Sequence, residues 1–227
     1  TIAAVALEDG YGDEFGIIKG EEAYLNINTI IKNIDKRFYV DATNNLVMFT
    51  DATKTYKTKI GGKTINETEN TDYVISFMDG KNCYVNVKFV KKYVDFDYKV
   101  MKAQGKSPAR IVLKYTSGEK NQMTVKSNIE MRTKADYQNL IVTTLKKNTK
   151  VTVLEESGDW TKVGTDDGFM GYVPAKKLKD KETKKTEFKS DADTYTHVLM
   201  NKKISLGWNA ITNLTANGNL ETIIEHT

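Results

Sequence analysis

Residues 150–163 read K-V-T-V-L-E-E-S-G-D-W-T-K-V, two alternating stretches around a Ser-Gly-Asp turn. The alternation from Val151 onward and again from Trp160 predicts a half-buried β-hairpin. The next stretch, D-D-G-F-M-G-Y-V-P at 166–174, adds a tight Asp-Gly turn. It also adds a strand that ends at Pro174, because proline cannot continue a hydrogen-bonded ladder. Short strands and tight turns in such close succession predict a small all-β barrel.

The first half of the chain contains a segment that is repeated 60 residues later. Y-L-N-I-N-T-I-I-K-N-I-D-K-R-F-Y-V at 24–40 aligns with Y-V-N-V-K-F-V-K-K-Y-V-D-F-D-Y-K-V at 84–100. Such self-similarity indicates one structural unit used twice. Each copy combines a short strand, a helix-like i, i+3, i+4, i+7 apolar spacing and a second strand. Further strands and turn signals lie between and after the copies. The fold class predicted for this half is therefore α+β, two helices on a mostly antiparallel sheet.

Scarce residues exclude several classes of site. The 227 residues include one cysteine, Cys83, and two histidines, His197 and His226, so we expect no intrachain disulfide, metal site or cofactor. The 34 basic and 30 acidic residues give a net charge of only +4, spread along the chain. Only three of the basic residues are arginine, so we expect no nucleic-acid binding. No apolar run reaches the ~20 residues of a membrane span. The oligomeric state stays open.

Four stretches are similar to the bacterial SH3 domain. They are the Met131-Arg132 start, L-K-K-N-T-K-V-T-V-L at 145–154, G-D-W-T-K-V at 158–163 and D-G-F-M-G-Y-V at 167–173. The resemblance implies binding to cell-wall peptides or glycans, with peptidoglycan as the expected partner. The stretch 133–136 departs from the family's usual Ser-Gly-Pro-Ser-like sequence, which leaves the particular ligand open.

The candidate ligand-binding residues in this segment are Asp136, Tyr137, Trp160 and Tyr172. Flat aromatic rings contact sugars and peptides at low entropic cost, and the Asp136 carboxylate could face a peptide amine. The alternative is structural: the rings of Trp160 and Tyr172 would belong to the barrel core, and Asp136 would be a solvated loop residue.

In the first half, the helix-then-strand unit repeated around I-G-G-K-T-I-N at 60–66 resembles the copper amine oxidase N-terminal-like domain of bacterial surface proteins. The resemblance covers about residues 20–117 and implies no copper site, in agreement with the absence of histidine there. Asp35 and Asp95 occupy equivalent positions after the two helical segments. This position favours a turn or cap role over acid/base chemistry.

The stretch K-I-S-L-G-W-N-A-I-T-N at 203–213 resembles the first barrel strand of family 18 glycoside hydrolases that carry SH3 domains. A strand at 203–208, a loop at 209–215 and a helix starting near Leu220 are predicted, the truncated strand-helix stump of a barrel. The acidic D-x-x-D-x-D-x-E run on which that family depends is absent from the sequence. No catalytic residue is therefore assigned.

These resemblances imply a non-catalytic cell-wall-targeting region of an exported glycoside hydrolase that acts on N-acetylated cell-wall or chitin-like glycans. The expected location is extracellular or on a bacterial cell wall. One alternative is a stand-alone surface binding or sensory protein with no enzyme domain. A third class, a cysteine enzyme using Cys83, is disfavoured because a cysteine nucleophile needs a histidine base and a packed strand position is expected for Cys83.

The expected organisation has five parts. It comprises an N-terminal arm at 1–19, an α+β domain at 20–117, an SH3 domain at 118–180, a charged linker at 181–198 and the barrel stump at 199–227. Because the chain begins with threonine, we expect it to be part of a longer protein.

Overall fold

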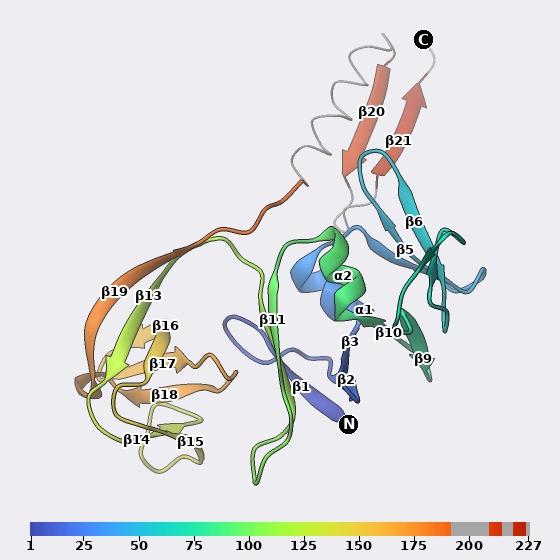
Figure 1. The fold of residues 1–227 in the computed structure, drawn as a ribbon. Helices are drawn as coiled ribbons and strands as arrows, with labels where there is room; N and C mark the ends of the chain where they lie inside the picture. The colour runs from blue at the N-terminus through green and yellow to red at the C-terminus, as the bar shows by residue number, and fades with distance from the viewer. Residues whose placement is uncertain (192–208, 215–219, 226–227) are drawn as a thin grey trace. The chain divides into compact units, whose positions relative to one another are not determined.

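A computed structural model describes residues 1–191, 209–214 and 220–225 (Figure 1). The chain divides into two units. Unit 1 contains Thr1, residues 14–95 and the described residues from 189 onward, and unit 2 contains residues 2–13 and 96–188. Each unit therefore draws on separate parts of the sequence. The five-part division expected from sequence stays a prediction, because it follows composition and resemblance rather than packing.

The fold is mostly β, so the predicted two-helix α+β class is wrong. Helical backbone does begin where the apolar spacing predicts it. However, α1 (Ile27–Thr29) continues only as one π-helical turn, η1 (Ile30–Ile34), and α2 (Val87–Tyr93) is short. Both segments end at an extended residue, and a strand begins soon afterwards. The spacing predicted the buried face but not the length, because β-branched residues such as isoleucine and valine favour strands.

The first strand and the helical segment of the 60-residue repeat are confirmed as a structural repeat in unit 1. Strands β2 (Gly16–Lys19) and β3 (Glu22–Asn26) correspond to β9 (Ser76–Asp79) and β10 (Asn82–Asn86), in the order β2-β3-β10-β9. The copies meet through the antiparallel β3–β10 pair, in which Leu25 lies opposite Val85, its own counterpart. In addition, α1 contacts β10 and α2 contacts β3. The two copies are thus related by an approximate two-fold axis.

Two equivalent asparagines of the repeat have the same structural role. Asn26 and Asn86 are fully buried, and the Oδ1 atom of each accepts a hydrogen bond from the backbone N–H two residues later, at 2.9 Å in both copies. This interaction caps the start of each helical segment. The Asp35 carboxylate binds the Arg37 side chain and backbone N–H, and Asp95 accepts the Lys189 backbone N–H. Asp35 thus makes the local contacts of a turn, as predicted, whereas Asp95 binds a backbone N–H group 94 residues further along the chain.

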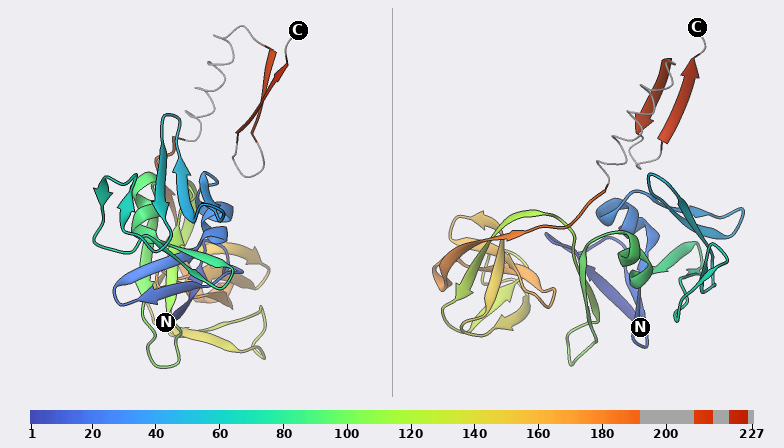
Figure 2. Two further views of the ribbon diagram at one scale, coloured as in Figure 1. Left: turned by 90° about the vertical axis from the view of Figure 1, so that its right-hand side faces the viewer. Right: turned by 45° about the horizontal axis from the view of Figure 1, so that its top comes forward.

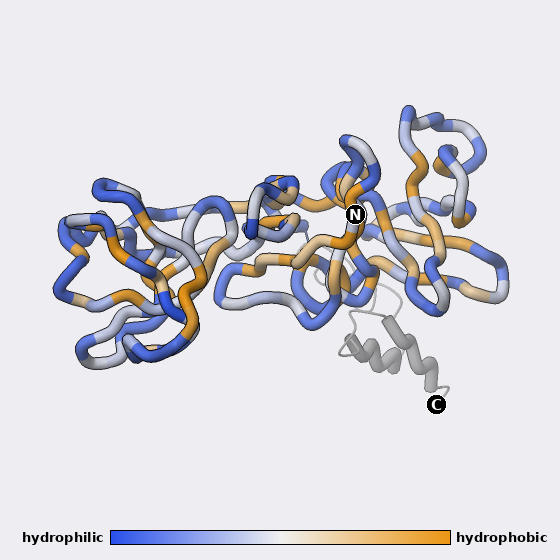
Figure 3. Tube along the Cα trace, turned by 90° about the horizontal axis from the view of Figure 1, so that it is seen from below, coloured by the Kyte–Doolittle hydropathy of each residue, from blue (hydrophilic) through white to orange (hydrophobic). Residues whose placement is uncertain are grey.

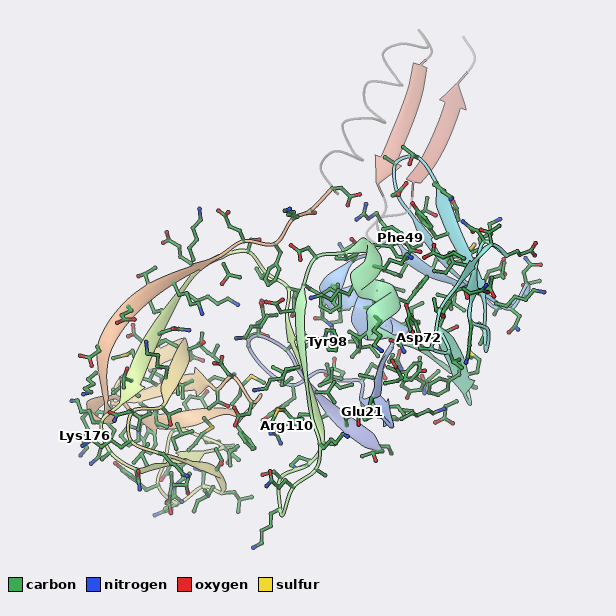
Figure 4. All side chains as sticks on the ribbon, in the orientation of Figure 1. Glu21, Phe49, Asp72, Tyr98, Arg110 and Lys176 are labelled. Atoms are coloured by element: carbon green, nitrogen blue, oxygen red, sulfur yellow. The ribbon has the colours of Figure 1, made fainter. Side chains whose placement is uncertain are left out.

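Unit 1 also contains the antiparallel sheet β4-β5-β6-β7-β8, visible in Figures 1 and 2. Its strands are β4 (Phe38–Asp41), β5 (Leu46–Thr50), β6 (Thr55–Lys59), β7 (Thr64–Ile65) and β8 (Glu69–Asn70). One face is an aromatic core. Phe49, labelled in Figure 4, lies 4.7 Å from Phe38 and 4.9 Å from Tyr93 of α2, measured between ring centroids.

Unit 2 begins with three neighbouring strands in the order β11-β12-β1. The first strand, β1 (Ile2–Ala6), pairs in parallel with β12 (Arg110–Lys114), which pairs antiparallel with β11 (Asp97–Met101). Two parallel strands need a long connection between them. In this pair the connection brings residues at the start of the sequence next to residues around position 110. Part of the predicted N-terminal arm is therefore a sheet strand.

The rest of unit 2 is an SH3-like sheet in the order β15-β14-β18-β17-β16-β13-β19. Its strands are β13 (Gly118–Val125), β14 (Ile129–Arg132), β15 (Ile141–Leu145), β16 (Lys150–Ser157), β17 (Trp160–Gly164), β18 (Met170–Pro174) and β19 (Leu178–Thr186). All seven strands contribute to one core: Val125, Met131, Leu145, Val151, Val163, Val173 and Leu178. The sheet therefore wraps around a single centre. Figure 3 shows apolar and hydrophilic segments interspersed along the chain. The predicted all-β barrel and its hairpin are confirmed.

The charged run beyond the barrel is partly strand. β19 extends to Thr186 and pairs with β13 from Gly118 onward. Most β19 residues are exposed, which suits their lysine and glutamate side chains. The first residues of the predicted linker therefore belong to a strand rather than to a loop. They are strand residues because β13 provides a hydrogen-bonding partner along its whole length.

The predicted strand-helix tail is wrong. Strand β20 (Asn209–Leu214) occupies the predicted loop, and β21 (Leu220–Glu225) occupies the predicted helix. The two pair antiparallel, with Leu214 opposite Leu220. An Asn-Gly dipeptide between them in the sequence is typical of hairpins, and this signal outweighs the few residues with helical spacing. The strand predicted at 203–208 lies outside the described residues.

Candidate ligand-binding site

The β17–β18 hairpin decides which way the candidate rings face. Along β17, Thr161 and Val163 are buried, whereas Trp160 and Lys162 are half-buried and point to the opposite side. In β18, Tyr172 lies opposite Lys162 and therefore shares this outer side. Neither Trp160 nor Tyr172 belongs to the barrel core. The structure thus places both rings on the outer face of the barrel, at its surface.

Tyr137 and Asp136 lie in the loop between β14 and β15. The loop is closed by a hydrogen bond from Thr133 N to Leu140 O, 3.0 Å long. The Asp136 carboxylate accepts the Gln138 backbone N–H at 2.9 Å, so it supports the turn. Tyr137 is 57% exposed and points its ring at Trp160, with the centroids 4.8 Å apart and the planes at 62°. Two candidates from distant parts of the sequence therefore touch.

Further side chains that sequence reasoning missed lie at the same end of the barrel. Leu140 is 78% exposed and Ile141 is 49% exposed, next to the loop that carries Tyr137. Arg132, which lies opposite Tyr172 in the β14–β18 pair, donates from Nη1 to Asn139 O at 2.9 Å. Two adjacent apolar residues after a polar loop were the available signal for Leu140 and Ile141. No sequence signal marked Arg132 as the residue that holds this loop.

The chemistry of this face is that of stacking and apolar contact. Tyr137, Trp160 and Tyr172 offer aromatic surface, while the nearby Arg132 is already paired with Glu130. Such a face suits a flat, weakly charged ligand such as a sugar ring or a peptide plane. Metal chemistry has no counterpart in the described ranges, which contain no group of three or more potential metal-binding side chains.

A tight contact attaches the barrel to β1 and β12 within unit 2. Arg110 of β12, labelled in Figure 4, is only 4% exposed. Its Nε donates to Asp167 O at 2.7 Å, and its guanidinium lies 4.1 Å from the centroid of the Phe169 ring. Between these two residues, Gly168 has a φ of +84°, and a Cβ atom there would lie 2.7 Å from Val112 Cγ2. The Asp-Gly turn thus docks on β12 in a way that only glycine permits.

Glu8 stabilises the same junction electrostatically. Its Oε1 accepts the backbone N–H groups of Tyr115 and Thr116, at 3.0 Å each, and lies 3.0 Å from Lys120 Nζ. Burial raises the pKa of Glu8, but the hydrogen bonds from Thr116, Lys120 and Tyr115 outweigh it and lower the pKa below its ordinary value. A cavity of about 80 Å³ adjoins this carboxylate. The junction therefore prefers a charged Glu8.

Cys83 lies on β10 and is 4% exposed. Burial raises the pKa of its thiol to about 11. The thiolate, which is the reactive form, is thereby disfavoured. The predicted packed strand position of Cys83 is confirmed.

Comparison with known families adds to this geometry. The class of this part of unit 2 is an SH3-like barrel, here with aromatic rings on its outer face. Residues 127–179 match the family described as bacterial SH3 domain. This segment is a bacterial SH3 domain, as its sequence motifs predict. Searches of curated proteins and of solved structures found no match for the chain. These comparisons lend no support to a copper amine oxidase-like domain or a glycoside hydrolase.

In the described residues, no helix has the length and apolar character that crossing a membrane requires.

Proposed function

We propose that the SH3 domain binds bacterial cell-wall peptidoglycan through the outer face that carries Tyr137, Trp160 and Tyr172. The observation that supports this proposal most directly is the Tyr137–Trp160 ring pair, which brings an exposed ring from a loop onto a strand residue. Part of the aromatic surface of this ring pair remains in solvent, where contact with a ligand would bury it and so stabilise the complex. An exposed aromatic group of this kind is typical of a recognition surface.

The binding energy should come from contact with rings rather than from charge. The chain has a net charge of only +4, and Arg132 beside the face is paired with Glu130. Binding through the rings should therefore change little with salt, whereas attraction of surface lysines to anionic wall polymers should weaken strongly. Salt dependence separates these two modes of wall association.

We further propose that the chain is a non-catalytic targeting region of an exported glycoside hydrolase that acts on N-acetylated glycans of the wall. Weak binding by a tethered domain raises the local concentration of substrate around an attached enzyme. The support for the enzyme is the resemblance at 203–213 together with its position after an SH3 domain. A reading frame that continues beyond Thr227 with a D-x-x-D-x-D-x-E run would agree with it. A stop codon or a membrane anchor in place of a catalytic domain would favour the alternative, a stand-alone surface binding or sensory protein with no enzyme domain.

Sedimentation of the full chain with purified peptidoglycan sacculi tests the binding. We expect the protein to sediment at low salt and at 0.5 M salt, and Tyr137→Ala to reduce the bound fraction about tenfold, a typical cost for an interface aromatic residue. Tyr39→Ala is the matched control, since Tyr39 is also an exposed tyrosine, on β4 of unit 1. Wild-type protein that stays in the supernatant under both conditions would refute the proposal.

A further inference from the structure

The loop that follows β1 lies against the SH3 domain, although it is outside the matched segment. Gly12 N donates to Val5 O at 2.8 Å and Leu7 N donates to Gly10 O at 2.9 Å, so the loop is folded back on itself. Two hydrogen bonds join it to the barrel hairpin. Lys162 Nζ donates to Asp9 O at 3.0 Å, and Met170 N donates to the Tyr11 hydroxyl at 3.3 Å.

Tyr11 takes the place of a missing strand residue. β14 pairs with β18 only at Arg132 and Tyr172, and β14 ends at Arg132. The Met170 N–H therefore lies beyond the end of β14, where the ladder offers it no carbonyl. The Tyr11 hydroxyl accepts this N–H, which satisfies a buried strand donor. The ring of Tyr11 itself remains 47% exposed.

The loop stands at the opposite end of the outer face from Trp160. In the β17–β18 register, Trp160 pairs with Pro174, Lys162 pairs with Tyr172, and Gly164 pairs with Met170. Beyond this last pair the face is covered, because Met170 packs with Ala6 and Val112. The open part of the face is therefore limited by the Tyr137–Trp160 pair at one end and by Tyr11 at the other.

We propose that Tyr11 and its loop form the second end of the ligand-binding face, which accepts an extended stem peptide of peptidoglycan. This inference depends on the proposed function. From Pro174 to Met170, four strand residues at about 3.3 Å each separate the two ends by about 13 Å. A bound peptide that touches both ends must have about four extended residues.

A peptide fits this face because its amide planes can lie against the rings and its one free amino group has counterparts there. A free amino group of a stem peptide can lie over an aromatic ring, where the negative π-face attracts cations. Asp136, in the loop that carries Tyr137, places a carboxylate near one end of the face. The Lys162 ammonium between the two ends is held by the Asp9 carbonyl oxygen. An uncharged glycan strand would use neither the carboxylate nor the cation–π contact.

Isothermal titration calorimetry of the full chain with soluble stem peptides of two and five residues tests this inference. We expect Tyr11→Ala to weaken binding of the five-residue peptide about tenfold and to leave the two-residue peptide unchanged. Tyr11→Phe keeps the ring and removes the bond to Met170 N, so it should lower the melting temperature and retain the affinity. Tyr39→Ala, at an equally exposed tyrosine of unit 1, is the control.

Three results overturn the inference. Equal losses for both peptides in Tyr11→Ala would show that Tyr11 only supports the fold of the hairpin. Unchanged binding of the longer peptide would show that the ring does not contact ligand. Binding of wild-type protein to sacculi without binding to either peptide would overturn the peptide assignment and leave the proposed wall binding intact. In contrast, failure to bind sacculi would refute the proposed function itself.

Discussion

The contact between the Asp-Gly turn and β12 makes Gly168→Ala the most informative single substitution. The glycine has a φ of +84°, and the new methyl group would lie 2.7 Å from Val112 Cγ2 and 3.0 Å from Ala6 Cβ. A left-handed backbone costs a residue with a Cβ about 1–2 kcal/mol. Overpacking a well-filled contact costs about 1–3 kcal/mol more. We therefore expect unit 2 to lose about 2–5 kcal/mol of unfolding free energy.

Gly158→Ala is the matched control. Gly158 has a φ of +60°, but no atom lies within 4 Å of the position its Cβ would occupy. This variant carries the backbone cost alone, so the difference between the two variants, about 1–3 kcal/mol, isolates the contact with β1 and β12.

Urea unfolding followed by Trp160 fluorescence measures this difference. A Trp208→Phe background leaves Trp160 as the only tryptophan of the chain. With a urea m-value of about 2 kcal/mol/M, the midpoint of Gly168→Ala should lie about 0.5–1.5 M below that of Gly158→Ala. Equal midpoints would refute the reasoning, because they would mean that the turn does not pack against β12.

Three further predictions concern buried polar and sulfur groups. The lowered pKa of Glu8 means that its stabilisation is present above the ordinary glutamate pKa and is lost as the pH falls through the folded-state value. Glu8→Gln should therefore lower the stability of unit 2 at pH 7 and flatten its decline in acid, as measured by urea midpoints. Cys83, with its pKa raised to about 11, should react with Ellman's reagent at pH 8 far more slowly in the native protein than in urea. Asn86→Ala removes the cap of α2 and the 2.9 Å bond to Glu22, and should cost unit 1 about 1–3 kcal/mol by circular dichroism.

Each of these expectations has a contrary outcome. An acid decline that is equally steep in Glu8→Gln would assign the pH dependence to other carboxylates. Equal thiol reaction rates in native and unfolded protein would contradict the buried position of Cys83. An unchanged melting curve for Asn86→Ala would mean that the cap does not stabilise the repeat.

Local sequence patterns were sufficient to predict those elements whose structure depends mainly on their own residues. The β16–β17 hairpin could be predicted because its turn residues and alternating side chains specify both strands. The repeat around Asn26 and Asn86 was visible because equivalent residues perform equivalent capping. In contrast, the helical spacing after Asn26 overestimated α1 and η1, because a few apolar residues at helical spacing cannot indicate how soon the chain must return to a strand.

The sequence by itself determined the composition limits, the 60-residue repeat and the SH3 hairpins, since these depend on neighbours along the chain. Only the tertiary structure decided that Leu25 faces its counterpart Val85, that β1 joins β12, and that Trp160 meets Tyr137 on the outer face. The same holds for Tyr11, whose hydroxyl binds Met170 N across 159 residues of sequence. Such contacts depend on which strands become neighbours, and strand neighbours are chosen by burial of the whole sheet rather than by local preference.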